Sequence, residues 1–172
     1  MAVKRIFLAP GASGSAQQLA RHADGLTARG LSVEMVSLPK GAAERATPAY
    51  VTTLGNDAPT SAIGGQSFGG RVASLIAPEV QPAALVLFAY PLHAPGRHEA
   101  WVERTAHWPE IRCPVLLLSG ESDPFARIDI LRAAVRQLPN ALLVTYPGVG
   151  HGVDRVLNAA LDEVATFIAA NT

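Results

Sequence analysis

The chain has 172 residues, of which 49% are hydrophobic and 16% are charged, and its formal net charge at pH 7 is zero. This length and apolar content predict one well-buried domain over residues 1–172 and exclude a disordered chain. The balanced charge offers no basic surface for nucleic acid or for an anionic membrane, so we expect neither as a partner.

The single cysteine, Cys113, can form no intrachain disulfide, which fits a reducing compartment. Because Pro114 and an apolar run follow it, we interpret Cys113 as a small buried side chain rather than a reactive thiol. The first residues enter a strand pattern without the apolar core of a secretory signal. No apolar run approaches the roughly 18 residues of a transmembrane helix. We therefore expect a cytoplasmic protein.

Short apolar runs alternate along the chain with longer segments of helical pattern. Strands are expected at residues 3–8, 31–36, 61–65, 83–88, 115–119 and 142–146. Helices are expected at residues 16–29, 67–77, 124–137 and 154–170, with a short helix that begins near Thr47 and has Pro48 in its first turn. Continuous apolar strands separated by helices indicate a minimal, mostly parallel sheet of about six strands covered on both faces, which is a three-layer α/β fold.

Residues 90–112 break this alternation. They contain two tryptophans, three histidines and three prolines, a composition unlike that of a regular element. The segment follows a strand, and ligands of parallel sheets bind at the carboxyl ends of strands. We therefore expect it to bound a substrate pocket, with Tyr90, Leu92 and His93 as candidate pocket residues. Ordinary packing beneath the loop is the alternative interpretation of these three.

A serine follows the third expected strand directly, in the pattern Gly65-Gln66-Ser67-Phe68-Gly69. Glycines two residues to either side of Ser67 remove the Cβ atoms that would clash in a sharp strand-to-helix turn. A serine at such a turn projects its Oγ above the sheet edge, beside a helix N-terminus that favours negative charge. Many glycine-rich pentapeptides are only turns, so a nucleophilic role also requires a base and an acid nearby.

A histidine and a carboxylate follow two other expected strands. Asp123 lies in the loop after the fifth strand, before Pro124, and His151 lies between two glycines in the loop after the sixth. Taken alone, Asp123 could simply cap a helix and His151 could be a surface side chain. Because parallel strands end at one edge of the sheet, however, we expect both to lie near Ser67. The order Ser, Asp, His along the chain matches the α/β-hydrolase arrangement.

Other titratable residues are weaker candidates. Glu121 is the second choice for the acid, and Asp154 is explained by its place in the first turn of the last helix. His22 falls within the first expected helix, where we expect it to be solvated.

Acyl transfer also requires hydrogen-bond donors for an oxyanion. We expect one to be the backbone N–H of Phe68, the residue after the serine, and the other to be the N–H of Ala12, in the loop after the first strand. The same loop could be a plain turn in which Ser13 or Ser15 caps the first helix. It could also bind phosphate, as in flavodoxin-like proteins.

Three segments carry a family resemblance. They are residues 64–71, Gly-Gly-Gln-Ser-Phe-Gly-Gly-Arg, residues 90–96, Tyr-Pro-Leu-His-Ala-Pro-Gly, and residues 120–125, Gly-Glu-Ser-Asp-Pro-Phe. In these the chain resembles the α/β-hydrolase superfamily, and in particular its small, lidless, dienelactone-hydrolase-like branch. The resemblance covers essentially the whole chain and implies an α/β-hydrolase fold without a cap domain.

The resemblance also implies that Ser67, Asp123 and His151 form a catalytic triad. Two departures are visible: Pro10-Gly11 stands where the superfamily often has His-Gly, and a serine replaces the cysteine of dienelactone hydrolases proper. We expect a serine hydrolase that cleaves a carboxylic ester or thioester of a small or extended substrate through an acyl-enzyme, with no metal or cofactor. The alternative is a non-catalytic scaffold that binds a partner, since the branch includes members of larger complexes.

Overall fold

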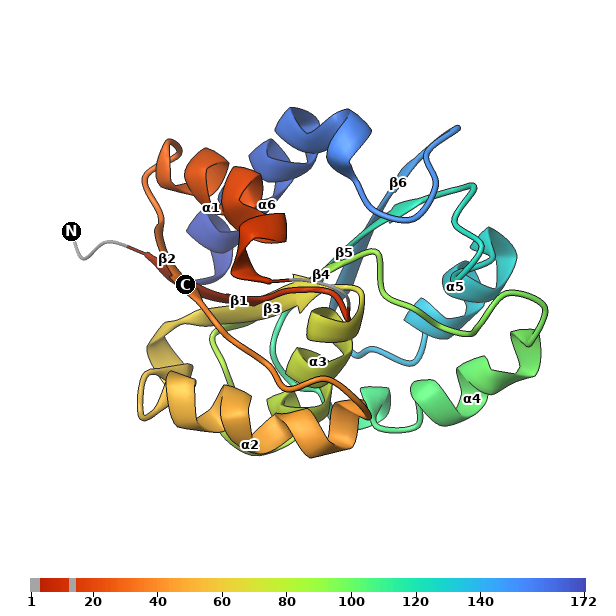
Figure 1. The fold of residues 1–172 in the computed structure, drawn as a ribbon, viewed down its shortest axis with the longest axis horizontal. Helices are drawn as coiled ribbons and strands as arrows, with labels where there is room; N and C mark the ends of the chain where they lie inside the picture. The colour runs from red at the N-terminus through yellow and green to blue at the C-terminus, as the bar shows by residue number, and fades with distance from the viewer. Residues whose placement is uncertain (1–3, 13–14) are drawn as a thin grey trace.

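A parallel β-sheet lies between two layers of helices (Figure 1). The computed structural model describes residues 4–12 and 15–172, and within them the sheet has six strands in the order β2-β1-β3-β4-β5-β6, with every neighbouring pair parallel. The strands are β1 (Arg5–Ala9), β2 (Ser32–Met35), β3 (Ala62–Gln66), β4 (Ala84–Phe88), β5 (Val115–Gly120) and β6 (Ala141–Tyr146). The predicted three-layer α/β fold is confirmed. Val3, expected to begin the first strand, lies outside the described residues.

The helices cover both faces of the sheet, with α1 and α6 on one side and α2 and α3 on the other (Figure 1). Their bounds are α1 (Ala20–Thr27), α2 (Ala43–Leu54), α3 (Phe68–Val80), α4 (Trp101–Arg104), α5 (Ile128–Val135) and α6 (Leu157–Asn171). The central strands are buried on both faces. In β1, Ile6 and Leu8 pack in the cluster that contains α1 and α6, whereas Phe7 and Ala9 pack in the cluster that contains α2 and α3.

Helix α2 begins at Ala43, earlier than expected, and Pro48 lies inside it rather than in its first turn. Proline has no N–H to donate to the carbonyl oxygen of Glu44, four residues back. The hydroxyl of Thr47 donates to that oxygen instead, at 2.9 Å. The predicted start was wrong because a neighbouring side chain satisfies the carbonyl that the proline leaves without a donor.

Helix α5 begins at Ile128, four residues later than expected. One oxygen of Asp123 accepts the N–H of Phe125 at 2.8 Å and so closes a tight turn around Pro124. The Asp-Pro pair therefore shapes the loop before the helix and does not cap it. Helices α1 and α6 also begin later than expected, because the 3-10 turns Ala16–Leu19 and Asp154–Val156 precede them.

The irregular segment between β4 and β5 is well packed. Tyr90, Leu92, Trp108 and Ile111 are buried in the cluster beneath α2 and α3, and between them run short helical turns that include α4. His22 is also buried, against the edge of the Phe88 ring, so the expectation that it is solvated was wrong. Burial lowers the pKa of His22 and keeps the ring neutral.

Cys113 is partly buried beside the same cluster, and burial raises the pKa of its thiol to about 11. That environment fits a packed side chain rather than a reactive thiolate. In the described part of the chain no helix is both long and apolar enough to cross a membrane.

Candidate active site

Ser67 occupies a strained turn between β3 and α3. Its φ is +50°, a conformation that residues with a Cβ rarely adopt. The N–H of Ser67 donates to the carbonyl of Phe88 at 2.8 Å, and the N–H of Arg71 donates to the carbonyl of Ser67 at 3.0 Å. A Cβ on Gly69 would overlap the carbonyl oxygen of Ala9 in β1. The glycine thus lets the start of α3 lie against the sheet and hold the serine in this geometry.

The structure brings Ser67, His151 and Asp123 together in one line of hydrogen bonds. The Nε2 atom of His151 lies 2.9 Å from the Oγ of Ser67, and its Nδ1 atom lies 2.8 Å from Oδ2 of Asp123. The Asp123 side chain is fully buried. A carboxylate can only accept a hydrogen bond, so Nδ1 of His151 carries the proton and donates to it. In the neutral ring Nε2 then has no proton and faces the serine hydroxyl.

Backbone hydrogen bonds hold the acid loop against the histidine loop. The N–H of Ser122 donates to the carbonyl of Val149 at 2.9 Å, and the N–H of Glu121 donates to the carbonyl of Tyr146 at 3.0 Å. A Cβ on Gly120 would overlap the carbonyl oxygens of Val149 and Gly150. The glycine at the end of β5 therefore lets the two loops approach closely enough for the carboxylate to reach the imidazole.

The glycines on either side of His151 differ. Gly152 has a φ of +98°, which favours glycine, whereas a Cβ on Gly150 would meet nothing within 4 Å. Only one of the two is required by the backbone.

The other acids that we considered point elsewhere. Oε1 of Glu121 accepts a hydrogen bond from the hydroxyl of Thr145 at 2.8 Å and lies 3.4 Å from a guanidinium nitrogen of Arg132. Asp154 begins the 3-10 turn before α6, and its charge raises the pKa of His22 against the larger effect of burial. In the described residues, Asp123 is the carboxylate that contacts His151.

A cavity of about 400 Å³ opens at Ser67, a size typical of small-molecule sites. Its walls come from the loop after β1, the turn around Ser67, the segment after β4 and the two loops that carry the acid and the base. The lining residues are Gly11, Ala12, Gln18, Gln66, Ser67, Phe68, Arg71, Pro91, Ala94, Arg104, Phe125 and His151.

The candidate pocket residues Tyr90, Leu92 and His93 do not line this cavity. All three are buried. The hydroxyl of Tyr90 donates to the carbonyl of Arg104 at 2.9 Å, and Nε2 of His93 accepts the N–H of Arg127 at 3.1 Å. Their side chains pack inside the fold, and Pro91 and Ala94 from the same segment line the cavity instead.

Phe68 and Ala12, the expected sources of oxyanion donors, both lie at the cavity. Phe68 is the first residue of α3, so its N–H has no acceptor within the helix. Ser15 precedes the first 3-10 turn without a side-chain cap hydrogen bond, and Ser13 lies outside the described residues. Among residues 4–12 and 15–172, no group of three or more His, Cys, Asp or Glu side chains could hold a metal ion.

Two cationic residues, Arg71 and Arg104, also line the cavity and were not predicted from the sequence. Arg71 could have been found, because it follows Ser67 by four residues on a predicted helix and so lies on the same face. Arg104 gives no local signal, because its position depends on how the irregular segment folds back over α3.

Comparison with known proteins identifies a family. The model of a family described as "Alpha/beta hydrolase domain" matches residues 40–162. The fold resembles that of a monoacylglycerol lipase from Paleococcus ferrophilus, with a TM-score of 0.82 and 12% identity over 98% of this chain and 95% of the other. Sequence comparison with curated proteins gives no match.

Two further solved structures are similar. A structure reported for the metagenome-derived lipolytic enzymes LipS and LipT has a TM-score of 0.78 and 14% identity, over 98% of this chain and 94% of the other. Est1E from Butyrivibrio proteoclasticus, solved with ferulic acid bound, has a TM-score of 0.77 and 16% identity, over 98% and 89%. Identities this low show a shared fold, and the dienelactone-hydrolase-like branch stays a prediction.

Proposed function

The chain belongs to the alpha/beta hydrolase family, and on that premise we propose that it is a serine hydrolase that cleaves a carboxylic ester or thioester. One observation carries the proposal: Asp123, His151 and Ser67 form an unbroken line of hydrogen bonds that ends in a cavity. The acid is buried and the serine hydroxyl lines the open end, which is the arrangement that nucleophilic acyl transfer requires.

In the proposed reaction the Oγ of Ser67 attacks the carbonyl carbon of the substrate while Nε2 of His151 takes the hydroxyl proton. Asp123 keeps the imidazole in the tautomer that can accept this proton and stabilises the imidazolium that forms. The imidazolium then gives its proton to the departing alcohol or thiol. An acyl group remains on Oγ of Ser67. A water oxygen then bonds to the acyl carbon while His151 takes a proton from the water, the bond to Oγ breaks to release the carboxylic acid, and His151 returns the proton to Oγ.

Charge develops on the carbonyl oxygen during both steps. We propose that the N–H of Phe68 and the N–H of Ala12 donate to it, since both residues lie at the cavity and the first of them begins a helix. The structural neighbours include a monoacylglycerol lipase and lipolytic enzymes, which supports an ester as the substrate class. The cavity has room for a small acyl group and its leaving group.

Labelling with a fluorophosphonate probe tests this proposal. We expect the native protein to gain one phosphonyl group, which is the probe mass less hydrogen fluoride, and the Ser67→Ala variant to gain none. Ser74→Ala is the matched control, because Ser74 also contacts a histidine but lies outside the cavity, and it should react like the native protein. Native protein that gains no adduct at saturating probe contradicts the proposal and favours a non-catalytic scaffold that binds a partner.

A further inference from the structure

We propose that the substrate carries a carboxylate, which Arg71 and Arg104 bind in the wall of the same cavity that holds Ser67. This inference rests on the proposed hydrolase function and names the class of ester on which it acts.

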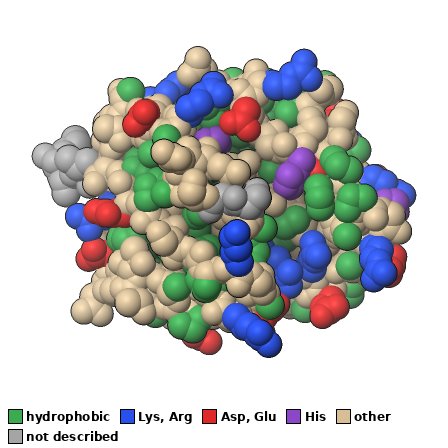
Figure 2. All heavy atoms as spheres, in the orientation of Figure 1, with side chains coloured by type: hydrophobic (Ala, Val, Ile, Leu, Met, Phe, Trp, Pro, Cys, Tyr) green, Lys and Arg blue, Asp and Glu red, His purple; other side chains and the backbone are tan. Residues whose placement is uncertain are grey.

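The charged side chains of the cavity lining are positive. Arg71 and Arg104 are its fully charged side chains, and no aspartate or glutamate is among the described residues that line it. An adjoining hollow of about 440 Å³ shares both arginines and adds Arg97 and Glu103, so the positive excess continues there. Figure 2 shows basic side chains gathered between the positions of α3 and α4, beside hydrophobic ones. An uncharged ester would not need such a wall.

Arg71 lies one helical turn after the serine and is held in place at its base. Its N–H donates to the carbonyl of Ser67, and one terminal nitrogen lies 2.9 Å from Oε1 of Glu44. Glu44 is 60% exposed and Arg71 is 22% exposed, so solvent partly screens this ion pair. The buried Nε of Arg71 has no hydrogen-bond partner among the described residues, so the five N–H donors of the group are not all satisfied.

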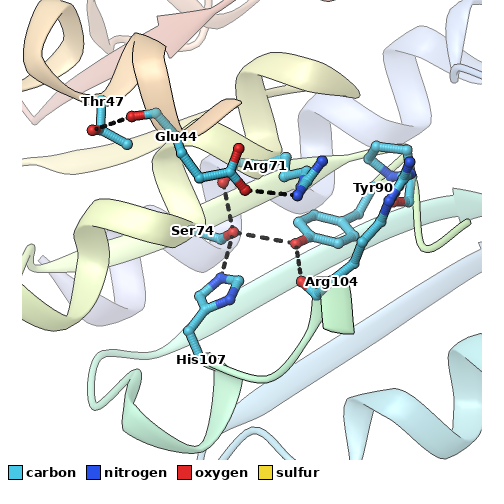
Figure 3. A network of polar contacts seen from close by, with 8 residues as sticks. Glu44, Thr47, Arg71, Ser74, Tyr90, Arg104 and His107 are labelled. Atoms are coloured by element: carbon cyan, nitrogen blue, oxygen red, sulfur yellow. Dashed lines mark hydrogen bonds and ion pairs between the residues drawn. The ribbon is translucent and has the colours of Figure 1, made fainter. Parts of the chain in front are cut away.

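Arg104 reaches the same wall from the end of α4. Its Nη1 donates to the carbonyl of Pro91 at 3.0 Å, and its own carbonyl accepts the hydroxyl proton of Tyr90. The first contact positions the guanidinium and the second holds the backbone of Arg104, both before any ligand arrives. Figure 3 shows the guanidinium groups of Arg71 and Arg104 on the side of the network that is remote from His107.

The two cations act on each other. Burial lowers the pKa of Arg104, and the positive charge of Arg71 lowers it further. A bound anion would relieve this repulsion. A carboxylate suits the site because its two oxygens match the planar fork of a guanidinium, and such charge-assisted pairs are short and strong. The competing explanation is that both arginines only tie α2, α3 and the segment after β4 together.

Matched esters separate the two explanations. One pair places the anion on the acyl side: mono(4-nitrophenyl) adipate and its methyl ester. The other pair places it on the leaving group: 4-acetoxybenzoate and methyl 4-acetoxybenzoate. The quantity measured is the ratio of kcat/KM for the charged ester to that for its neutral partner, with the rate in Ser67→Ala subtracted as background.

We expect the native ratio to be about ten or more in one of the two pairs, the effect of one charge-assisted contact. Arg71→Gln and Arg104→Gln should each lower that ratio at least about ten-fold, mainly through KM. Arg136→Gln removes an exposed arginine outside the cavity and should leave the ratio unchanged. If an arginine variant proves unstable by circular dichroism, inhibition of the native protein by free adipate or 4-hydroxybenzoate, but not by the methyl esters, supplies the same test.

A native ratio of one or below in both pairs overturns the inference, as does a ratio that survives both arginine substitutions. Fluorophosphonate labelling of Ser67 distinguishes the two levels of the account. A labelled protein without charge preference contradicts the carboxylate site alone, whereas an unlabelled protein contradicts the hydrolase function as well.

Discussion

The structure contains two serine–histidine pairs, one at Ser67, just before α3, and one at Ser74, within it. The distance from the serine oxygen to the histidine nitrogen is the same in both. Ser67 Oγ is 2.9 Å from Nε2 of His151, and Ser74 Oγ is 2.9 Å from Nε2 of His107 (Figure 3 shows the second pair). By distance alone either serine could be a nucleophile. Their surroundings give the two contacts opposite chemical meanings.

The first difference is the direction of the proton. Asp123 accepts from Nδ1 of His151, so Nε2 is free to take the proton of Ser67. We assign the single hydroxyl proton of Ser74 to the carbonyl of Arg71, 2.8 Å away, because that oxygen is a nearer acceptor than the Tyr90 hydroxyl at 3.4 Å. With this assignment Nε2 of His107 donates to the serine oxygen. One histidine is placed as a base and the other as a donor in a structural network.

The second difference is the backbone conformation of each serine and whether its side chain faces the cavity. Ser67 has a positive φ and lines the cavity, whereas Ser74 is buried within α3, outside the cavity lining. The comparison teaches that the two serines differ in the acid partner of their histidine, in backbone strain and in access to the cavity, and not in their distance from a ring nitrogen.

Replacing each histidine by glutamine gives the strongest test of this contrast. His151→Gln removes the proposed base and should lower kcat for a 4-nitrophenyl ester by about 10⁵-fold or more. His107→Gln should change kcat by less than about three-fold, since its ring donates within a buried network. Initial rates of the two purified variants, with folding checked by circular dichroism, decide the matter. Equal losses would mean that the two pairs do not differ as we describe.

Removing the acid should have the next largest effect. Asp123→Asn keeps the shape but no longer holds the imidazole in its accepting tautomer, so we expect a loss of about 10⁴-fold in kcat. Glu121→Gln is the matched control in the same loop, and its rate should stay close to that of the native protein because Glu121 contacts Thr145 and Arg132. A greater loss of kcat in Glu121→Gln than in Asp123→Asn would identify Glu121 as the acid partner of His151 instead.

A smaller effect should follow from crowding the two loops that meet at His151. Gly120→Ala places a Cβ against the carbonyl oxygens of Val149 and Gly150 and should cost about 1–3 kcal/mol of unfolding free energy, together with a measurable loss of kcat. Gly150→Ala meets open space and should change neither quantity much. Urea unfolding and ester hydrolysis measure both effects. Equal behaviour of the variants would show that loop contact does not position the imidazole.

The smallest expected effect concerns the structural histidine. Burial lowers the pKa of His107 from 6.5 to about 4, with the charge of Arg71 adding to the shift. Between these values the unfolded chain binds more protons than the native one, so this contribution to stability is complete above pH 6.5 and is lost as the pH falls toward 4.

Urea midpoints measured from pH 7 to pH 4 should therefore fall less steeply in His107→Gln than in the native protein. After allowance for its partial exposure, we expect a difference of about 1–2 kcal/mol across this window. Parallel curves for the two proteins would contradict a partly buried His107 whose pKa is lowered on folding.

The positions of Ser67, Asp123 and His151 followed from the sequence because a parallel sheet brings the ends of all its strands to one edge. Only the order of the strands along the chain and the shortness of the loops are needed to predict these positions. The residues of the cavity wall did not follow, because which side chains of residues 90–112 face inward depends on packing against α3. Tyr90 and His93 turned inward to bond with Arg104 and Arg127, and no local pattern signals this.

Helix ends and buried polar groups were mispredicted for a related reason. The hydroxyl of Thr47 lets Pro48 sit inside α2, and the carboxylate of Asp123 closes a turn that delays α5. The ring of His22 was assigned to solvent because one helix alone does not show that α1 packs over the sheet beside α6. Each outcome depends on a neighbour distant in sequence or on a side-chain hydrogen bond.

Mapping the acyl-enzyme tests the central contrast most directly. The protein is mixed with 4-nitrophenyl acetate, quenched in acid during the burst and digested with trypsin, which cleaves after Arg71 and so places Ser67 and Ser74 in different peptides. We predict that the acetyl group is found in the peptide that ends at Arg71, on Ser67, and that none is found in the peptide that contains Ser74. An acetyl group on Ser74, or turnover without any acylated serine, would contradict the account.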